Sequence, residues 1–302
     1  MLFITIWPLF ALICLGFVLM RKGFPDPAFW PAAERLNYFL LFPALLVSSL
    51  VKAPLDDPQI LRLGAAALAT ITLAVVAMAI ARRIFPAPAA RFGPAVQGAV
   101  RFNTYLGLAV TASIAGSAGV ERAAVYLAIC VPFVNVLSIM ALSERDVLRR
   151  PGALLKTMLR NPLILACLLG IALALLGLGL PFGIGTFLEL LARGSLPLGL
   201  LCVGAALQPK ALGRDGLVVG GNAALRLLGM PMLAALVAWG FGLNGVEALV
   251  LVVFSAIPTA PTAYVLTRQL NGDGTLMAGL VTFQTLAAVV TIPLVLLVLG
   301  YG

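Results

Sequence analysis

Histidine is absent from this sequence, and charged residues are scarce, since only 10% of its 302 residues are Asp, Glu, Lys or Arg. Soluble domains carry a charge on about a quarter of their residues. The four cysteines all lie inside apolar runs and form no Cys-x-x-Cys pair: Cys14, Cys130, Cys167 and Cys202. These absences argue against a structural zinc site or a disulfide framework. We therefore expect no metal and no cofactor, and we interpret the cysteines as small core residues.

Hydrophobic residues, by contrast, make up 62% of the chain, and the mean hydropathy is +1.11. They form long apolar runs separated by short charged loops, which is the pattern of a polytopic helical membrane protein. The alternating ten-residue segments typical of a transmembrane barrel are not found. The composition therefore predicts an all-α integral membrane protein.

The apolar runs predict ten transmembrane helices. Their expected ranges are 2–20, 35–51, 62–81, 94–116, 122–142, 161–179, 190–207, 217–241, 247–267 and 275–300. The positive charges of Arg21 and Lys22 follow the first run instead of preceding it, and no small-residue cleavage site comes after them. We therefore expect a retained first helix and not a cleaved signal peptide.

Basic residues gather in alternate loops. One set of loops holds fourteen of them: Arg21, Lys22, Arg35, Arg82, Arg83, Arg91, Arg145, Arg149, Arg150, Lys156, Arg160, Lys210, Arg214 and Arg268. The other set holds only Lys52, Arg62, Arg122 and Arg193. The positive-inside rule assigns the first set to the cytoplasm. We therefore expect a multi-pass protein of the bacterial inner membrane with both termini on the periplasmic face, and the net charge of +9 needs no nucleic-acid partner.

An internal repeat relates the two halves of the chain, which the charged loop 143–160 separates. An offset of 154 residues connects three landmarks: Pro8 with Pro162, Pro43 with Pro197, and 103–107 with 257–261. Each half holds five predicted spans, and because five is odd, the second half enters the membrane in the opposite sense. The sequence thus predicts two inverted five-helix repeats, 1–152 and 153–302.

Two predicted spans in corresponding positions contain helix-breaking residues. The ninth carries Pro258 and Pro261, and a proline inside a helix costs roughly 3 kcal/mol. The fourth has no proline but offers Asn103 and Gly107, which tolerate non-helical backbone. Paired broken helices are typical of secondary transporters, where the freed backbone groups line a cavity and helix amino termini attract anions. A simple proline kink in a packed helix is the alternative.

We predict a substrate-binding site where the two broken spans cross near the membrane midplane. Its candidate residues are Arg101, Asn103, Thr104, Tyr105, Gly107, Asn135, Ser255, Pro258, Thr259, Pro261 and Thr262. Arg101 and Arg226 are the basic residues well inside spans, and a buried arginine needs a cavity or a partner. Each is expected to attract an anionic substrate or, alternatively, to snorkel to the cytoplasmic surface or cap carbonyl groups of a broken helix.

All eleven acidic residues lie in loops or near the ends of predicted spans. Proton relays and cation pathways in membranes usually use buried Asp, Glu or His. This placement argues against a carboxylate proton relay and against a charged sodium site, but it leaves open a sodium ion held by backbone carbonyl groups. The pair Asp56–Asp57 precedes Pro58 in a short outer loop, and we interpret it as a turn and not as a metal site.

Several segments resemble the auxin efflux carrier family, whose bacterial members are related to the plant PIN carriers. They are RFNTYLGLAV (101–110), NPLILACLLGIAL (161–173), CVGAALQP (202–209), SAIPTAPTAYVLTRQLNGDG (255–274) and TFQTLAAVVTIPL (282–294). The resemblance runs the full length and is to the short bacterial form, without a long hydrophilic central loop. It implies ten helices in two inverted halves, broken helices crossing at spans four and nine, and transport of small organic anions. It places Asn103 and Gly107 on the first crossover and Pro258 and Pro261 on the second.

The expected function is that of a secondary transporter, and specifically an exporter of a small organic anion such as a carboxylate or an auxin-like acid. With no histidine and no midspan carboxylate, we expect electrogenic uniport driven by membrane voltage. A proton- or sodium-coupled symporter of the bile acid symporter type stays open, as does a channel. An embedded enzyme would need a cluster of His, Asp, Cys or Glu, so no enzymatic activity is expected. The expected partners are the anion and membrane lipid, with a homodimer left open.

Overall fold

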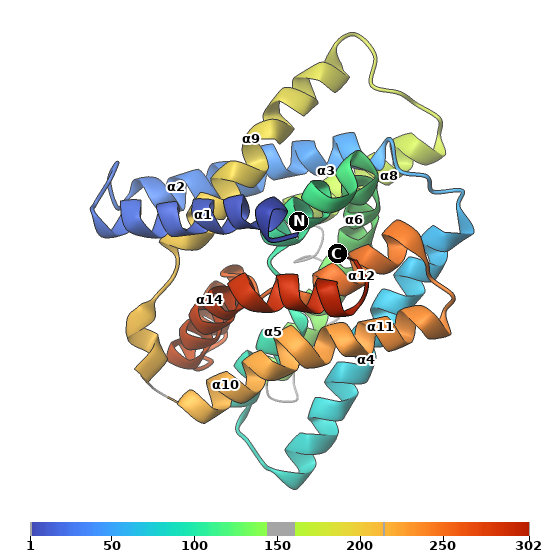
Figure 1. The fold of residues 1–302 in the computed structure, drawn as a ribbon. Helices are drawn as coiled ribbons and strands as arrows, with labels where there is room; N and C mark the ends of the chain where they lie inside the picture. The colour runs from blue at the N-terminus through green and yellow to red at the C-terminus, as the bar shows by residue number, and fades with distance from the viewer. Residues whose placement is uncertain (1, 144–160, 214, 302) are drawn as a thin grey trace.

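The computed structural model describes residues 2–143, 161–213 and 215–301, and the regular elements within these ranges are all helices (Figure 1). The all-helical prediction is therefore confirmed. The predicted boundary between the two halves, at residues 152 and 153, lies outside the described residues. The same holds for part of the basic set assigned to the cytoplasm: Arg145, Arg149, Arg150, Lys156, Arg160 and Arg214.

The helices follow one another along the chain with short connections. Before the gap at 144–160 they are α1 (Leu2–Arg21), α2 (Phe29–Leu36), the π-helical turn η1 (Asn37–Leu41), α3 (Phe42–Leu50), α4 (Pro58–Ile84), α5 (Ala89–Val100) and α6 (Thr104–Leu142). After it come α8 (Pro162–Leu175), α9 (Ile184–Ala205), the 3₁₀ turn η3 (Pro209–Gly213), α10 (Gly216–Ala224), the π-helical turn η4 (Leu225–Gly229), α11 (Met230–Gly240), α12 (Gly245–Ala256), α13 (Thr262–Gln269) and α14 (Gly274–Val298).

Within the described residues, six helical stretches are long and apolar enough to cross a membrane: Phe3–Arg21, Pro58–Ile84, Ala89–Leu142, Ile184–Ala205, Gly216–Gly240 and Gly274–Val298. Pro162–Leu175 and Gly245–Ala256 are shorter apolar helices. The stretch Ala89–Leu142 covers the predicted fourth and fifth spans, and α6 turns between them at Gly116, whose φ of 60° suits glycine. Length and composition thus support a multi-pass membrane protein, while the ten-span topology stays a prediction.

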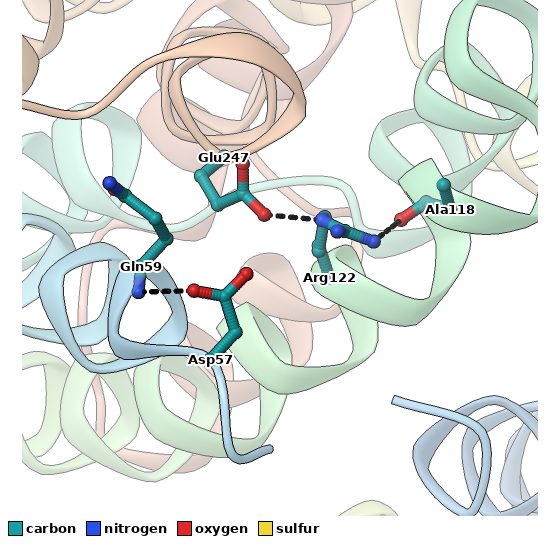
Figure 2. A network of polar contacts seen from close by, with 5 residues as sticks. All are labelled: Asp57, Gln59, Ala118, Arg122 and Glu247. Atoms are coloured by element: carbon teal, nitrogen blue, oxygen red, sulfur yellow. Dashed lines mark hydrogen bonds and ion pairs between the residues drawn. The ribbon is translucent and has the colours of Figure 1, made fainter. Parts of the chain in front are cut away.

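Polar side chains at several helix starts accept a backbone N–H of the first turn, which is the usual role of an amino-terminal cap. The four acceptors are Asn103, Asp57, Asn161 and Asp273, which bond the N–H groups of Leu106, Gln59, Leu163 and Leu276. Figure 2 shows the Asp57 carboxylate accepting the Gln59 N–H at 2.8 Å. Leu55 and Asp56 form a turn before this cap, so the prediction of a turn at the Asp56–Asp57 pair is confirmed.

The helices pack as two groups, which meet mainly along α6. The first helix group contains α1, α2, η1, α3, α8 and α9, and the second contains α4, α5, α6, α10, η4, α11, α12, α13 and α14 (Figure 1). Glycines allow α1 and α9 to touch, because a Cβ on Gly204 would lie only 1.8 Å from the Ile13 carbonyl oxygen. Long-range polar contacts concentrate within the groups, as between Asn37 and Ser195 in the first.

Candidate functional site

Two helices of the second group stop inside the protein and resume after a few extended residues. α5 ends at Val100 and α6 begins at Thr104, while α12 ends at Ala256 and α13 begins at Thr262. The Asn103 N–H donates to the Pro258 carbonyl oxygen at 2.9 Å, so the two breaks touch directly. The helices are therefore interrupted at these two positions and are not continuous helices with a simple proline kink, while their crossing as membrane spans stays a prediction.

The two broken helices match each other closely. α5 and α12 each contain 12 residues, and each is followed by an extended residue, Arg101 with φ −76° and ψ 152°, and Ile257 with φ −76° and ψ 153°. This equivalence corresponds to an offset of 156 residues, two more than the 154 predicted from the sequence. One offset cannot hold along the whole chain, because connections of different length shift each helix separately.

A cavity of about 550 Å³ lies between the two helix groups, beside the breaks. The second group contributes seven of the predicted site residues to its wall: Arg101, Asn103, Thr104, Tyr105, Asn135, Pro261 and Thr262. The first group closes the cavity opposite them with Glu34, Tyr38 and Asn161, among others. Because helices from both groups form the wall, movement of one group against the other would change the cavity.

Two residues of this cavity wall carry a buried donor atom that has no partner among the described residues. Arg101 Nη2 lies 3.4 Å from Thr262 Oγ1, while Arg101 Nη1 is buried and has no hydrogen-bond partner among the described residues. Asn103 Oδ1 accepts the Leu106 N–H, but Asn103 Nδ2 is likewise buried and unpaired within the described structure. A buried donor without an acceptor is costly, so a ligand that brings acceptor oxygens would be favoured here.

Helix polarity adds to this preference. α6 and α13 both begin in the cavity wall, since Thr104 and Thr262 line it. The amino terminus of a helix carries roughly half a positive charge and exposes free N–H groups, which suits it to anions. Together with Arg101, the two termini make this part of the wall electropositive.

Four predicted site residues do not line the cavity: Gly107, Ser255, Pro258 and Thr259. Gly107 packs against Phe254, which a Cβ on the glycine would approach to 2.7 Å, and Ser255 is buried inside α12. Pro258 turns its carbonyl oxygen to Asn103. Gly107 and Pro258 therefore hold the two breaks together from within, through close packing and a backbone hydrogen bond.

Thr259 illustrates the same point through a network of amides beneath the breaks. Its N–H donates to Gln284 Oε1 at 2.9 Å and its hydroxyl donates to the Gln97 carbonyl oxygen at 3.0 Å. Gln284 Nε2 in turn donates to the Gly98 carbonyl oxygen and to Asn222 Oδ1. The extended backbone at Thr259 therefore finds a partner in α14 in place of a lost helical bond, and Asn222 of α10 holds that partner in position.

Arg226 follows one of the two alternatives that the sequence left open. Its guanidinium donates to three backbone carbonyl oxygens, those of Ala99, Phe254 and Ile257, and its side chain is buried away from the cavity. Capping of broken helices is therefore its role, and the attraction of an anionic substrate was the wrong alternative for this residue.

Sequence reasoning missed the wall that the first helix group supplies. Tyr38 and Asn161 lie far from the breaks along the chain, and Asn161 also caps α8. In the sequence, the only indication that either residue could line a cavity was its place as a polar residue beside an apolar run. An ion pair at the other end of α12 was also missed, between Glu247 and Arg122 of α6 (Figure 2). Within the described residues, no group of three or more His, Cys, Asp or Glu could hold a metal ion.

Comparison with known proteins identifies the family of this chain. The model of a family described as "Membrane transport protein" matches residues 143–296. An uncharacterized transporter from Methanothermobacter thermautotrophicus is 28% identical over 298 residues, which cover 96% of each chain. The chain therefore belongs to this membrane transport protein family, the auxin efflux carrier family that segments of its sequence resemble.

Proposed function

We propose that this membrane transporter carries a small organic anion, such as a carboxylate or an auxin-like acid, by alternating access around the cavity at the two breaks. The observation that carries the proposal is the pair of unpaired buried donors, Arg101 Nη1 and Asn103 Nδ2, in the wall of that cavity. A carboxylate would supply acceptor oxygens to both and would add charge-assisted hydrogen bonds. The proposed binding residues are the seven predicted ones that line the cavity wall, while Gly107, Pro258 and Thr259 support the breaks and Ser255 lies buried inside α12.

The size and lining of the cavity favour a small substrate. Ligand pockets usually measure about 300–1,000 Å³, and the 550 Å³ found here lies in that range. Aromatic and aliphatic side chains form much of the wall, including Phe102, Tyr105 and Val134. Such a wall accommodates the carbon skeleton of an organic acid, while the donors at the breaks hold its carboxylate.

The proposed topology has ten spans in two inverted halves, and both chain termini lie on the periplasmic face of the membrane. Arg35 and Gln269 are exposed residues of the cavity wall, and Arg35 and Arg268 belong to the loops that the positive-inside rule assigns to the cytoplasm. In this topology the cavity opens toward the cytoplasm, where an exported anion would enter. Movement of one helix group against the other would then open it to the outside.

Voltage alone is sufficient to drive export of a monoanion. An anion that leaves a cell with a negative interior gains about 2.3 kcal/mol per charge for each 100 mV. At equilibrium this supports an outward gradient of roughly 50-fold, because each 1.4 kcal/mol is a factor of ten. We therefore propose electrogenic uniport, and proton- or sodium-coupled symport is the competing mechanism.

Proteoliposomes test the proposal directly. Purified protein is reconstituted, a potassium diffusion potential is set with valinomycin, and uptake of malonate, malate and indole-3-acetate is measured without a pH or sodium gradient. Uncharged indole-3-acetamide is the matched control substrate. We expect at least one anion to accumulate on the positive side and the amide to be ignored. Uptake that responds only to a proton or sodium gradient would refute uniport, and failure of every anion under all gradients would refute the assigned substrate class.

A further inference from the structure

A single guanidinium connects the carboxyl ends of both broken helices. Arg226 lies in η4, and its side chain is 1% exposed. Its Nε donates to the Ile257 carbonyl oxygen at 2.7 Å, its Nη1 to that of Ala99 at 2.9 Å, and its Nη2 to that of Phe254 at 2.6 Å. Ala99 belongs to the last turn of α5 and Phe254 to the last turn of α12, so these carbonyl groups have lost helical partners.

The charge of this guanidinium is balanced by helices and not by a carboxylate. The ion pairs found among the described residues involve Asp215, Glu189 and Glu247, and none of them includes Arg226. A helix carboxyl terminus carries roughly half a negative charge, so the ends of α5 and α12 together offset about one positive charge. A buried arginine is otherwise expensive in a membrane. The two helix ends therefore favour a cation between them.

Transporters with broken helices commonly place a coupling cation at such a position, where half-helix carboxyl ends and unwound carbonyl groups coordinate sodium. In this protein the side chain of Arg226 occupies the corresponding position, at the carboxyl ends of α5 and α12. We propose that Arg226 is a tethered cation that takes the place of a coupling ion at the crossover. The guanidinium holds both helix ends through the whole transport cycle, so no sodium ion has to bind before the anion site is assembled.

Arg226 acts on the anion site as a positioning residue. It does not line the cavity, whereas Asn103 and Thr104 beyond the first break do. By holding the end of α5 and the residue after α12, it fixes the two segments whose contact is the Asn103–Pro258 hydrogen bond. Its importance for transport rests on the proposed function, but the cation site itself can be measured without any substrate.

The experiment uses the full chain, purified in detergent with no organic anion. Melting temperatures are measured for the wild type, Arg226→Ala and Arg82→Ala in sodium or choline chloride at equal ionic strength, and in low-millimolar guanidinium chloride. Arg82 is the matched control, because its Nε also donates to a backbone carbonyl oxygen, that of Ala87, at 2.9 Å and away from the crossover. A cation that binds only the folded form raises the melting temperature.

For the wild type, we expect the melting temperature in sodium chloride to equal that in choline chloride. We expect the same for Arg82→Ala. Arg226→Ala should melt at least about 5 °C lower than the wild type, because three charge-assisted hydrogen bonds are lost. Guanidinium, and to a lesser extent sodium, should restore part of this loss, while choline should not. A sodium-specific rise in the wild type would overturn the proposal. So would an Arg226→Ala protein that melts like the wild type or responds equally to all three cations.

Arg226→Lys keeps the inference testable if the alanine variant does not fold. Lysine retains the charge, but its ammonium lacks the planar fork that reaches three carbonyl oxygens at once. We expect this variant to fold, to melt below the wild type and to remain insensitive to sodium. A melting temperature equal to that of the wild type would overturn the role of the fork. These melting results stand even if every transported anion proves different from those proposed.

Discussion

Replacing Arg101 with glutamine removes the cation closest to the proposed anion site while keeping a polar side chain. Arg101 lies at the first break, half-buried in the cavity wall, and its Nη1 has no partner among the described residues. A hydrogen bond to a charged group contributes about 1.5–3 kcal/mol. Loss of one such bond to a bound carboxylate should therefore weaken binding roughly ten- to hundredfold.

Arg35→Gln is the matched control for this change. Arg35 belongs to the same cavity wall and carries the same charge, but its side chain is exposed at the rim. Exposed charges contribute at most about 1 kcal/mol, because water and salt screen them. The control variant should therefore bind the anion no more than roughly fivefold more weakly than the wild type.

The assay is direct binding to the purified protein of whichever carboxylate the liposome panel identifies, by isothermal titration calorimetry. Melting temperatures without ligand are recorded beside it, so that a folding defect is not mistaken for a binding defect. If Arg101→Gln binds the anion as tightly as the wild type, or if both variants weaken binding to the same extent, the carboxylate does not bind at Arg101 and the reasoning from its unpaired donor is wrong.

Two further predictions concern stability and topology. Glu247 is buried and pairs with Arg122 (Figure 2), so Glu247→Gln and Arg122→Gln should each destabilise the protein by about 1–2 kcal/mol, and the double variant by less than their sum. Additive losses in thermal melting would show that the pair does not couple α6 to α12. In a Cys14→Ser background, a cysteine added at either chain terminus should react with a membrane-impermeant maleimide outside intact cells. Labelling of either terminus only after the cells are broken would contradict the proposed orientation.

Much of the fold could be predicted from the sequence because the membrane restricts the available structures. Long apolar runs in lipid must form helices, since their backbone groups have no water to bond. The helix starts could be anticipated as well, because Asp57 before Pro58 and Asn161 before Pro162 are ordinary capping sequences. The second break followed from Pro258 and Pro261, which cannot continue a helix.

Other features depend on tertiary packing, which no local pattern records. The first break contains no proline, and it is held open by Asn103 capping α6 and by its contact with the second break. The π-helical turns η1 and η4 carry no distinctive sequence, although η4 contains Arg226. The cavity wall from the first helix group joins residues more than a hundred positions apart, such as Tyr38 and Asn161.

The polar residues at the two helix breaks divide according to whether the protein itself satisfies their hydrogen bonds. Thr259 and Arg226 were both candidates for substrate contact in the sequence, but their donors end on backbone carbonyl and amide oxygens. Arg101 and Asn103 keep buried donors unpaired beside the cavity. Since an unpaired buried donor costs free energy, one that belongs to the residues of a cavity wall marks a binding site better than residue type alone. Residue type therefore indicates where polar groups are needed, and only the three-dimensional structure separates those that hold the helix breaks from those left for a ligand.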